Sequence, residues 1–534
     1  MLALKLAIGF LAVCSIVSGS VGRKKYKFLT YSPQFANSHV NFMGKISDAL
    51  VDAGHEITML SPIIDRSIGT PGTKRAKVIE IPQTNHSLFV EEIWQLGQES
   101  LWNAVSVREM IPDWGPIFEA HGHNCNATIH ELGLLEMLRA EKFDAAYAEA
   151  IDFCGFGLFH LLGIKKFAVT QSQAAFDGSY YITQVPSMPS YVPSLYGAMA
   201  GDSMSFYERL YNWWMTVLWD YINEAHQIPY LQKVFDQFDG FPSLKELVSN
   251  ASLVFLNSEP LVDFPRITSH RVVDIGGIVD NGEHKPVNKT WSEILDLRPR
   301  TVLLSFGSYA KAYHLPDEYK AAIRETILKF PDVTFIWKYE KPEHRVSEGI
   351  PNLIEATWIP QVDILYDSRL TAFVTHGGQG SITEAYAAGV PLLVIPIGYD
   401  QLRNAHQVVR NGAGVMLDKS LLGSSDHLES AIRELVDNAA RFSANARKLS
   451  SLVKDRPFSP KETFVRHMEF LAEHGPLRML NHEGRHLNFF QFYLLDVFTM
   501  LVGVIFLAVC LAFVFIRTVL GVFLRTVQQK EKSE

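Results

Sequence analysis

The chain has 534 residues, with 49 Lys and Arg against 57 Asp and Glu, which gives a formal net charge of −8 at pH 7. This mildly acidic balance excludes the basic surface that a nucleic-acid-binding protein needs. With 47% hydrophobic and 20% charged residues, the composition also excludes an intrinsically disordered chain. The length predicts about two to four domains.

The first 20 residues have the layout of a secretory signal peptide. Lys5 precedes an apolar run from Leu6 to Val17, and the small residues Ser18 to Ser20 follow. This pattern predicts cleavage near Ser20. A buried N-terminal strand would explain neither the length of the run nor the small residues at its end.

The body of the chain begins as a βαβ unit. Residues 26–31 and 56–60 are predicted strands, and between them apolar residues recur at helical spacing from Val40 to Val51. From about Arg300 a second series of apolar runs begins, two of which lead into glycine loops, as in a parallel doubly wound sheet. We therefore predict an α/β fold of two Rossmann-like domains facing a cleft, at residues 21–280 and 281–496.

Four cysteines are too few for a disulfide-rich scaffold. Cys14 and Cys510 lie in apolar end segments, which leaves Cys125 and Cys154 in the body. A bond between these two is possible, but the sequence favours two separate thiols that are reduced or partly buried.

The segment from Phe206 to Glu224 is dense in aromatic residues. These side chains could line an apolar pocket or dip into a membrane surface. A helix that packs its aromatic residues into the core is an equally good explanation, so the sequence leaves both open.

A membrane anchor is predicted near the C-terminal end. Residues 497–516 contain no charge, and 20 residues at 1.5 Å each span about 30 Å, the thickness of a bilayer core. Arg517 and later basic residues give a weak positive-inside signal, so we expect a cytoplasmic tail at residues 517–534 and a translocated body. Four glycosylation sequons agree with that orientation: Asn85, Asn126, Asn250 and Asn288.

The run from Phe373 to Gln401 carries the most chemical information. A strand delivers His376 to the turn Gly377-Gly378, and a helix opens near Ser381. The unpaired N–H groups at a helix start suit a diphosphate, and glycines let the main chain approach it closely. Glu384, about one turn inside the helix, could accept from ribose hydroxyls, and Asp400 and Gln401 could hold sugar hydroxyls.

This run resembles the signature of the UDP-glycosyltransferase family, and Trp358-Ile359-Pro360-Gln361 matches its WxPQ opening. The resemblance implies that Trp358 stacks on uracil, that Gln361 hydrogen-bonds nearby and that Ser308 touches the diphosphate. It also implies the GT-B fold, with an N-terminal acceptor domain and a C-terminal UDP-sugar domain. The layout of the whole chain is similar to the animal, membrane-bound branch, the UDP-glucuronosyltransferases.

Within the family a histidine after the first strand is the general base, and His39 occupies that position here. The family orients this histidine with an Asp in a motif resembling FDxxxxD, where this chain has Glu149. We favour Glu149 as the orienting carboxylate and keep Asp152 as the other candidate. The expected chemistry is a single inverting displacement, and the sequence shows no metal-ligand motif and no need for a cofactor besides the UDP-sugar co-substrate.

Two departures bear on the donor. Gly380 stands where relatives often have Asn, and Asn257 falls near the position of an Arg that would pair with a glucuronate carboxylate. We predict a UDP-glucuronosyltransferase that conjugates small lipophilic hydroxyl, acid or amine acceptors. The alternatives are a UDP-glucose-dependent enzyme of the same family and an inactive membrane-anchored UDP-sugar or lipophile-binding protein, which only an unfit Glu149 would favour.

The resemblance also suggests a location. Lys530 and Lys532 resemble a dilysine retrieval signal of the endoplasmic reticulum, although a merely solvated tail would look the same. We expect a single-pass protein of that membrane with its body in the lumen. The sequence predicts no oligomeric state.

Overall fold

The computed structural model describes residues 24–533 except 86, 89–90, 93–96, 98–99, 103–114, 178–179, 186 and 279–283. The predicted signal peptide, residues 1–20, lies outside the described residues. The chain divides into one compact unit that ends at Leu480 and a second that begins at Asn481.

In the described part of the first unit, a seven-stranded sheet has the order β3-β2-β1-β4-β5-β6-β7. Neighbouring strands are parallel throughout. Most of these strands are apolar runs because helices cover both faces of a parallel sheet. The strands are β1 (Lys27–Tyr31), β2 (Glu56–Pro62), β3 (Lys77–Ile81), β4 (Ala145–Glu149), β5 (Phe167–Gln171), β6 (Leu253–Leu256) and β7 (Val272–Asp274).

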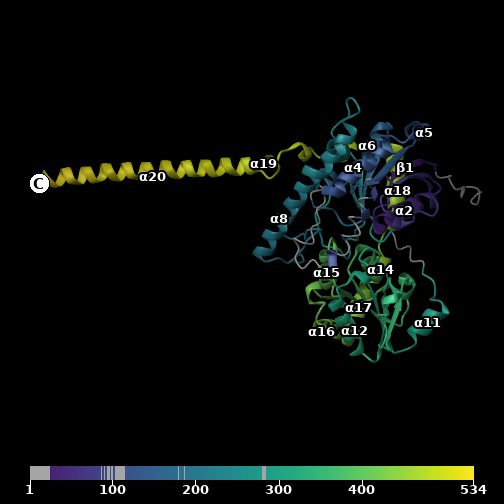
Figure 1. The fold of residues 1–534 in the computed structure, drawn as a ribbon. Helices are drawn as coiled ribbons and strands as arrows, with labels where there is room; N and C mark the ends of the chain where they lie inside the picture. Colours follow the sequence, from purple (N-terminus) through teal and green to yellow (C-terminus); the bar gives the residue numbers. More distant parts are fainter. Residues whose placement is uncertain are drawn as a thin grey trace, which may run out of the picture. The chain divides into compact units, whose positions relative to one another are not determined.

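Helices connect these strands (Figure 1). The predicted opening βαβ unit is present, with the first helix between β1 and β2. The helices are α2 (Asn37–Asp52), α4 (Gly115–Ile129), α5 (Leu134–Glu141), α6 (Cys154–Leu161), α7 (Tyr180–Thr183), α8 (Phe206–Ile222), α9 (Ile228–Phe235) and α10 (Leu244–Ser249).

A second parallel sheet follows, with six strands among the described residues in the order β10-β9-β8-β11-β12-β13. Its strands are β8 (Arg300–Ser305), β9 (Val333–Lys338), β10 (Leu353–Ala356), β11 (Leu370–Thr375), β12 (Leu392–Val394) and β13 (Gly414–Met416). Its helices are α11 (Lys289–Leu295), α12 (Asp317–Leu328), α13 (Gln361–Leu365), α14 (Gln379–Ala388), α15 (Gln401–Arg410), α16 (Ser425–Asp437) and α17 (Ala439–Lys454).

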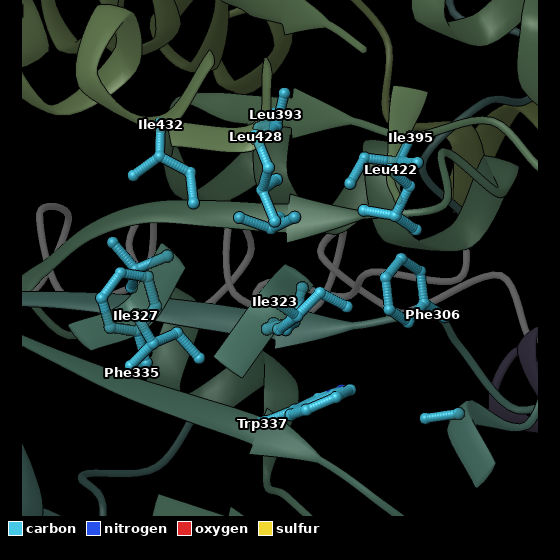
Figure 2. Close-up of a cluster of buried hydrophobic side chains, with 14 of the residues drawn as sticks. Phe306, Ile323, Ile327, Phe335, Trp337, Leu393, Ile395, Leu422, Leu428 and Ile432 are labelled. Carbon is cyan, nitrogen blue, oxygen red and sulfur yellow. The ribbon is translucent and has the colours of Figure 1, made fainter. Parts of the chain in front are cut away.

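Each sheet has its own buried core. Figure 2 shows one face of the second sheet, where Phe335 and Trp337 pack with side chains of the surrounding helices. The last helix of the first unit, α18 (Pro460–His474), returns to the core of the first sheet, where the rings of Phe464 and Phe255 lie 4.8 Å apart. The predicted fold of two doubly wound α/β halves is confirmed.

The second unit contains α19 (Phe489–Phe492) and α20 (Leu495–Glu531) (Figure 1). Helix α20 is long and apolar enough to cross a membrane, and it includes the uncharged run predicted at residues 497–516. The helix continues through Arg517 to Glu531, so the predicted tail is largely helical. The chain therefore carries a candidate membrane anchor at the expected place.

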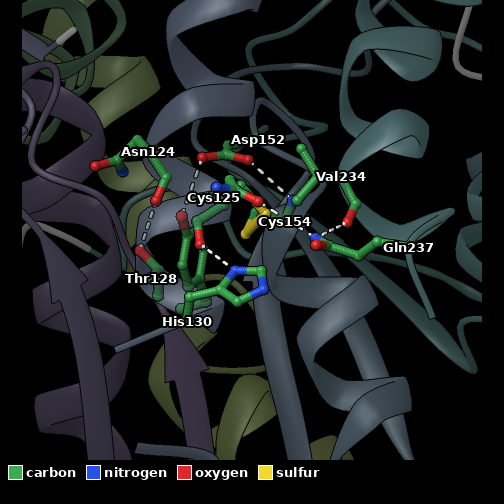
Figure 3. Close-up of a disulfide and its surroundings, with 10 residues drawn as sticks. Asn124, Cys125, Thr128, His130, Asp152, Cys154, Val234 and Gln237 are labelled. Atoms are coloured by element: carbon green, nitrogen blue, oxygen red, sulfur yellow. Dashed lines mark hydrogen bonds between the residues drawn. A yellow bond between two sulfur atoms is a disulfide. The ribbon is translucent and has the colours of Figure 1, made fainter. Parts of the chain in front are cut away.

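Cys125 and Cys154 form a disulfide, which corrects the prediction of two separate thiols. Cys125 lies in α4 and Cys154 begins α6, and their Cα atoms are 5.6 Å apart (Figure 3). The tertiary packing of α4 against α6 brings together two residues that are 29 positions apart. Sequence spacing alone does not give that distance.

The aromatic segment forms α8, and most of its aromatic side chains are exposed. Trp219 is buried, whereas the side chains of Tyr207 and Trp214 keep 79% and 57% of their surface accessible. The core-packing explanation is therefore wrong for most of this helix.

Candidate active site

Three polar residues meet at the carboxyl edge of the first sheet. His39 lies in the first turn of α2, just after β1; Glu149 ends β4; and Ser172 follows β5. Because β1, β4 and β5 are adjacent and parallel, their carboxyl ends open at the same edge, the usual ligand site of an open α/β sheet. All three residues are buried, with accessible fractions of 7%, 4% and 5%.

These side chains form a hydrogen-bonded group. His39 Nδ1 lies 2.9 Å from Glu149 Oε1 and 2.8 Å from Ser172 Oγ. The backbone N–H of Ser172 donates to the same Glu149 oxygen at 2.8 Å. Burial raises the pKa of the Glu149 carboxyl, but the His39 imidazole and the hydrogen bonds from Ser172 outweigh it and leave the pKa below its usual value.

An ionised Glu149 fixes the tautomer of the imidazole. A carboxylate only accepts hydrogen bonds, so the proton of neutral His39 resides on Nδ1, and Nε2 keeps its lone pair. An imidazole with a free Nε2 and a carboxylate behind Nδ1 can take a proton from a bound hydroxyl. The one extra methylene of Glu149, relative to the expected Asp, does not prevent this contact.

Asp152, the other candidate carboxylate, lies elsewhere. It accepts from the backbone N–H of Cys154 at 2.9 Å and from the Tyr31 hydroxyl at 3.4 Å. Figure 3 shows it beside the disulfide. Burial raises the pKa of this carboxyl. The structure thus brings Glu149 to His39 and places Asp152 at the start of α6.

Asn257 supports the same loop from the next strand. It directly follows β6, is 5% accessible, and donates from Nδ2 to the carbonyl of Ser172 at 2.9 Å. At the position where the family that the sequence resembles carries an Arg, this chain therefore has a buried, neutral side chain. It is bonded to Ser172, whose hydroxyl contacts His39.

The second sheet presents a glycine-rich loop with its own histidine. His376 follows β11, and a Cβ added at Gly307 or at Gly378 would approach its ring to 2.6 or 2.5 Å. Burial and the charge of Lys338 lower the pKa of His376 to about 4, so its imidazole is neutral near pH 7. Ser308 is exposed directly after Gly307.

The turn at Gly377 requires glycine. Its φ is +86°, and a Cβ there would lie 2.5 Å from Val394 Cγ1. Gly378 is the N-cap of α14, and among the described residues no side chain caps this helix start. Its first N–H groups and the helix dipole are therefore available to an anion, as predicted for a diphosphate.

The predicted nucleoside-binding residues gather beside this helix start. Gln361, at the start of α13, donates from Nε2 to Glu384 Oε2 at 2.7 Å and lies 3.4 Å from Ser381 Oγ. Trp358, three residues before Gln361, has 68% of its surface accessible to solvent. Gln361 thus joins Ser381 and Glu384, which lie about 20 residues later in the chain, beside the start of α14.

Asp400, in the loop before α15, lies within electrostatic range of His39. Burial raises the pKa of the Asp400 carboxyl to about 6, while the hydrogen bond from Asn404 and the electrostatic effect of the nearby His39 imidazole lower it. Gln401 is turned back, because its Oε1 accepts from the backbone N–H groups of Ile397 and Gly398 at 2.7 and 3.1 Å. Of the two predicted sugar-binding residues, Asp400 is thus the one near His39.

Sequence reasoning missed Ser172 and Asn404. Asn404 Nδ2 donates to the Gly377 carbonyl at 2.9 Å and to Asp400 Oδ2 at 2.8 Å, so it joins two predicted donor loops. Its place four residues after Asp400, on the same helix face, is a signal that was available. Ser172 lies in a plain polar stretch after β5 and gave no signal.

A cavity of about 60 Å³ has a lining that begins at Ala175, three residues after Ser172 in the chain. Phe176, Met188 and Val192 are among its apolar lining residues. Its two arginines are paired, Arg266 with Asp274 at 3.2 Å and Arg403 with Asp263 at 2.8 Å. Apolar side chains and paired arginines therefore line this cavity together.

The chain matches, over residues 27–533, the family model described as "UDP-glucoronosyl and UDP-glucosyl transferase". It is 30% identical over 521 residues to ugt-47 of Caenorhabditis briggsae, with 93% of each chain covered. It is 28% identical over 490 residues to UDP-glucuronosyltransferase 1A7 of Rattus norvegicus, with 89% of this chain and 88% of the rat protein covered.

Among solved structures, the fold is similar to that of CalG4, the calicheamicin glycosyltransferase. The TM-score is 0.57 at 16% identity, with 85% of this chain and 100% of that chain covered. The likeness confirms the predicted GT-B architecture of two Rossmann-like halves.

Proposed function

Because the chain belongs to the UDP-glucuronosyl and UDP-glucosyl transferase family of hexosyltransferases, we propose that it transfers glucuronate from UDP-glucuronate to small lipophilic acceptors. The acceptors are hydroxyl, acid or amine compounds, and the transfer inverts the anomeric carbon. The 2.9 Å contact between His39 and Glu149 carries this proposal, because it supplies an oriented base at the predicted place. It also removes the only feature that favoured an inactive binding protein.

The proposed reaction is one displacement. His39 Nε2 takes the proton of the acceptor hydroxyl, and the acceptor oxygen attacks the anomeric carbon as the bond from that carbon to the diphosphate breaks. Glu149 holds Nδ1 and stabilises the imidazolium that forms, while Ser172 fixes both partners. UDP leaves with its charge stabilised by the N–H groups at the start of α14.

Donor binding is assigned to the second sheet. In this proposal Trp358 stacks on uracil, Gln361 and Glu384 hold the nucleoside, and Ser308 contacts the diphosphate with the glycine turn after β11. Asp400 accepts from sugar hydroxyls. The contact of Gln361 with Glu384 at 2.7 Å supports a shared role for these two residues.

UDP-glucose is the second candidate donor, and a specific observation favours it. Asn257 is neutral, buried and bonded to the Ser172 carbonyl, so it cannot form the bidentate pair that an Arg makes with a carboxylate. The relatives' names favour glucuronate, whereas this residue favours a neutral sugar.

We place the body in the lumen of the endoplasmic reticulum, with α20 as its single membrane span. The disulfide supports an oxidising compartment. All four sequon asparagines (Asn85, Asn126, Asn250 and Asn288) are exposed, which agrees with a lumenal body. Lys530 and Lys532 would act as the retrieval signal.

The test is UDP release by the detergent-solubilised full chain, with UDP-glucuronate and UDP-glucose compared across a panel of phenols and sterols. Release with UDP-glucuronate alone supports the proposal. Release with UDP-glucose alone assigns the second donor and makes Asn257 the reason. UDP binding without acceptor-dependent release from either donor, in the wild type as in the control His39→Ala, would contradict the enzymatic proposal.

A further inference from the structure

Helix α8 presents an apolar, aromatic face to the outside of the first unit. The exposed positions recur every three or four residues and so form one stripe along the helix. Between Leu210 and Trp219 the sequence contains no charged residue. The stripe consists of Phe206, Tyr207, Leu210, Trp213, Trp214, Val217 and Tyr221, each at least 38% accessible.

The opposite face of α8 is firmly attached to the protein. Asn212 is buried, accepts from the backbone N–H of Ser194 at 2.7 Å and donates to the carbonyls of Pro189 and Val192 at 2.8 Å. Ser205 and Glu208 cap the helix start reciprocally. The aromatic stripe is therefore the outer face of an ordered helix, with its inner face already packed.

A stripe of this size needs a covering partner. Soluble proteins rarely expose contiguous apolar patches on this scale. Its composition identifies the partner's chemistry, because Trp and Tyr, with an apolar body and a polar tip, are enriched where hydrocarbon meets water at a bilayer surface. A helix with one such face lies in the plane of that interface.

The chain itself supplies a bilayer. Only residues 481–494 separate the first unit from α20, the candidate membrane span. Fourteen residues reach at most about 50 Å, so a bilayer crossed by α20 is always within range of the first unit. The tether gives the lipid surface a high effective concentration, which favours even a weak contact.

We propose that the aromatic stripe of α8 inserts into the interfacial region of a phospholipid bilayer and forms a second membrane contact, separate from α20. Insertion removes the exposed apolar side chains from water, while Arg209 and Glu208 at the helix start stay with the headgroups. This contact holds the first unit against the lipid surface.

The experiment uses the full chain in detergent-free phosphatidylcholine nanodiscs. In a Cys510→Ala background, Trp213→Cys is labelled with bimane, and quenching by nitroxide lipids is measured. Asp317→Cys, at an exposed polar position on α12, is the control, and Tyr207→Cys is a second stripe variant with less risk to folding. UDP binding by each labelled protein reports that it is folded.

The proposal expects label at position 213 or 207 to be quenched by headgroup-level nitroxide at least about twofold more than label at position 317. Shallow nitroxide should quench more than nitroxide deep in the acyl chains. Equal quenching at the stripe and control positions would overturn the proposal. A label shielded from water yet not quenched by lipid would overturn it too, and would indicate a second copy or another protein on this face.

Discussion

Two histidines follow central strands of the two sheets, yet their surroundings differ. His39 follows β1 and contacts Glu149 and Ser172. His376 follows β11 and lies between two glycine turns beside Lys338, which, together with burial, lowers its pKa to about 4. The position at a strand end is shared, but the neighbouring charges decide what each imidazole can do.

The difference assigns opposite electrostatic tasks to the two edges. At His39 a carboxylate stands ready for the positive charge that appears when the imidazole takes a proton. At His376 a cation disfavours that charge, and the start of α14 offers N–H groups to an anion. One edge is suited to proton transfer and the other to a diphosphate.

The largest expected effect is loss of the first imidazole. His39→Ala should lower kcat by about 10² or more, because it removes the base that takes the acceptor proton. UDP affinity should stay near wild type, since UDP binds at the other edge. Turnover and calorimetric UDP binding check both statements, and unchanged turnover would rule out His39 as the base.

The next effect separates the two carboxylates. Glu149→Ala should lower kcat by about tenfold to a hundredfold, because the imidazole loses the partner that fixes its tautomer. Asp152→Ala should leave kcat within about twofold and act on folding, because the buried Asp152 accepts from the backbone N–H of Cys154, the first residue of α6.

Glu149→Gln sharpens this comparison. The amide oxygen can still accept from Nδ1 but carries no charge, so its kcat should lie between those of wild type and Glu149→Ala. If Asp152→Ala lowered turnover more than Glu149→Ala, with both proteins folded, the assignment of the orienting carboxylate would be reversed.

Most of the fold was predictable because it follows from local patterns. The opening βαβ unit, the glycine loops and the apolar anchor each depend on residues close in sequence. The prediction that Cys125 and Cys154 are separate thiols was wrong, because the distance between them depends on how α4 and α6 pack. The sequence could not decide whether the aromatic residues of α8 are buried or exposed for a similar reason. An aromatic stripe has the same sequence pattern whether the core or a membrane covers it.

The site was predictable where a residue follows a strand or glycine turn with a recognisable pattern. His39 and the run from His376 to Glu384 belong to that class. The roles of these residues stay predictions, but the structure brings His39 to Glu149 and Gln361 to Glu384. Ser172 carries no local signal, and Asn257 was noted in the sequence only for its bearing on the donor. The order of β4, β5 and β6 is what brings the two residues together.

A smaller effect is expected at the second edge. In Gly378→Ala the new Cβ would lie 2.5 Å from His376 Nε2, so the turn before α14 must shift. We expect KM for the UDP-sugar to rise by about tenfold while kcat changes much less, because the diphosphate binds in the ground state as well. Gly380→Ala is the matched control, since its Cβ would meet nothing within 4 Å. Equal kinetics for the two variants would contradict a diphosphate site at this turn.

The smallest effect on turnover is expected at Asp400. Asp400→Asn keeps an oxygen that can accept from Asn404 and loses only the charge, so kcat/KM should fall by about threefold.

The same substitution should increase the stability of the fold near neutral pH. Burial raises the folded-state pKa of Asp400 from 3.8 to about 6. The ionised carboxylate therefore lowers the free energy of unfolding above pH 6, and this destabilisation disappears as the pH falls toward 4. Asp400→Asn should therefore raise the thermal midpoint at pH 7.5 and do so less at pH 5. A gain that is larger at pH 5 would mean that the fold favours the ionised form, and that His39 and Asn404 offset its burial completely.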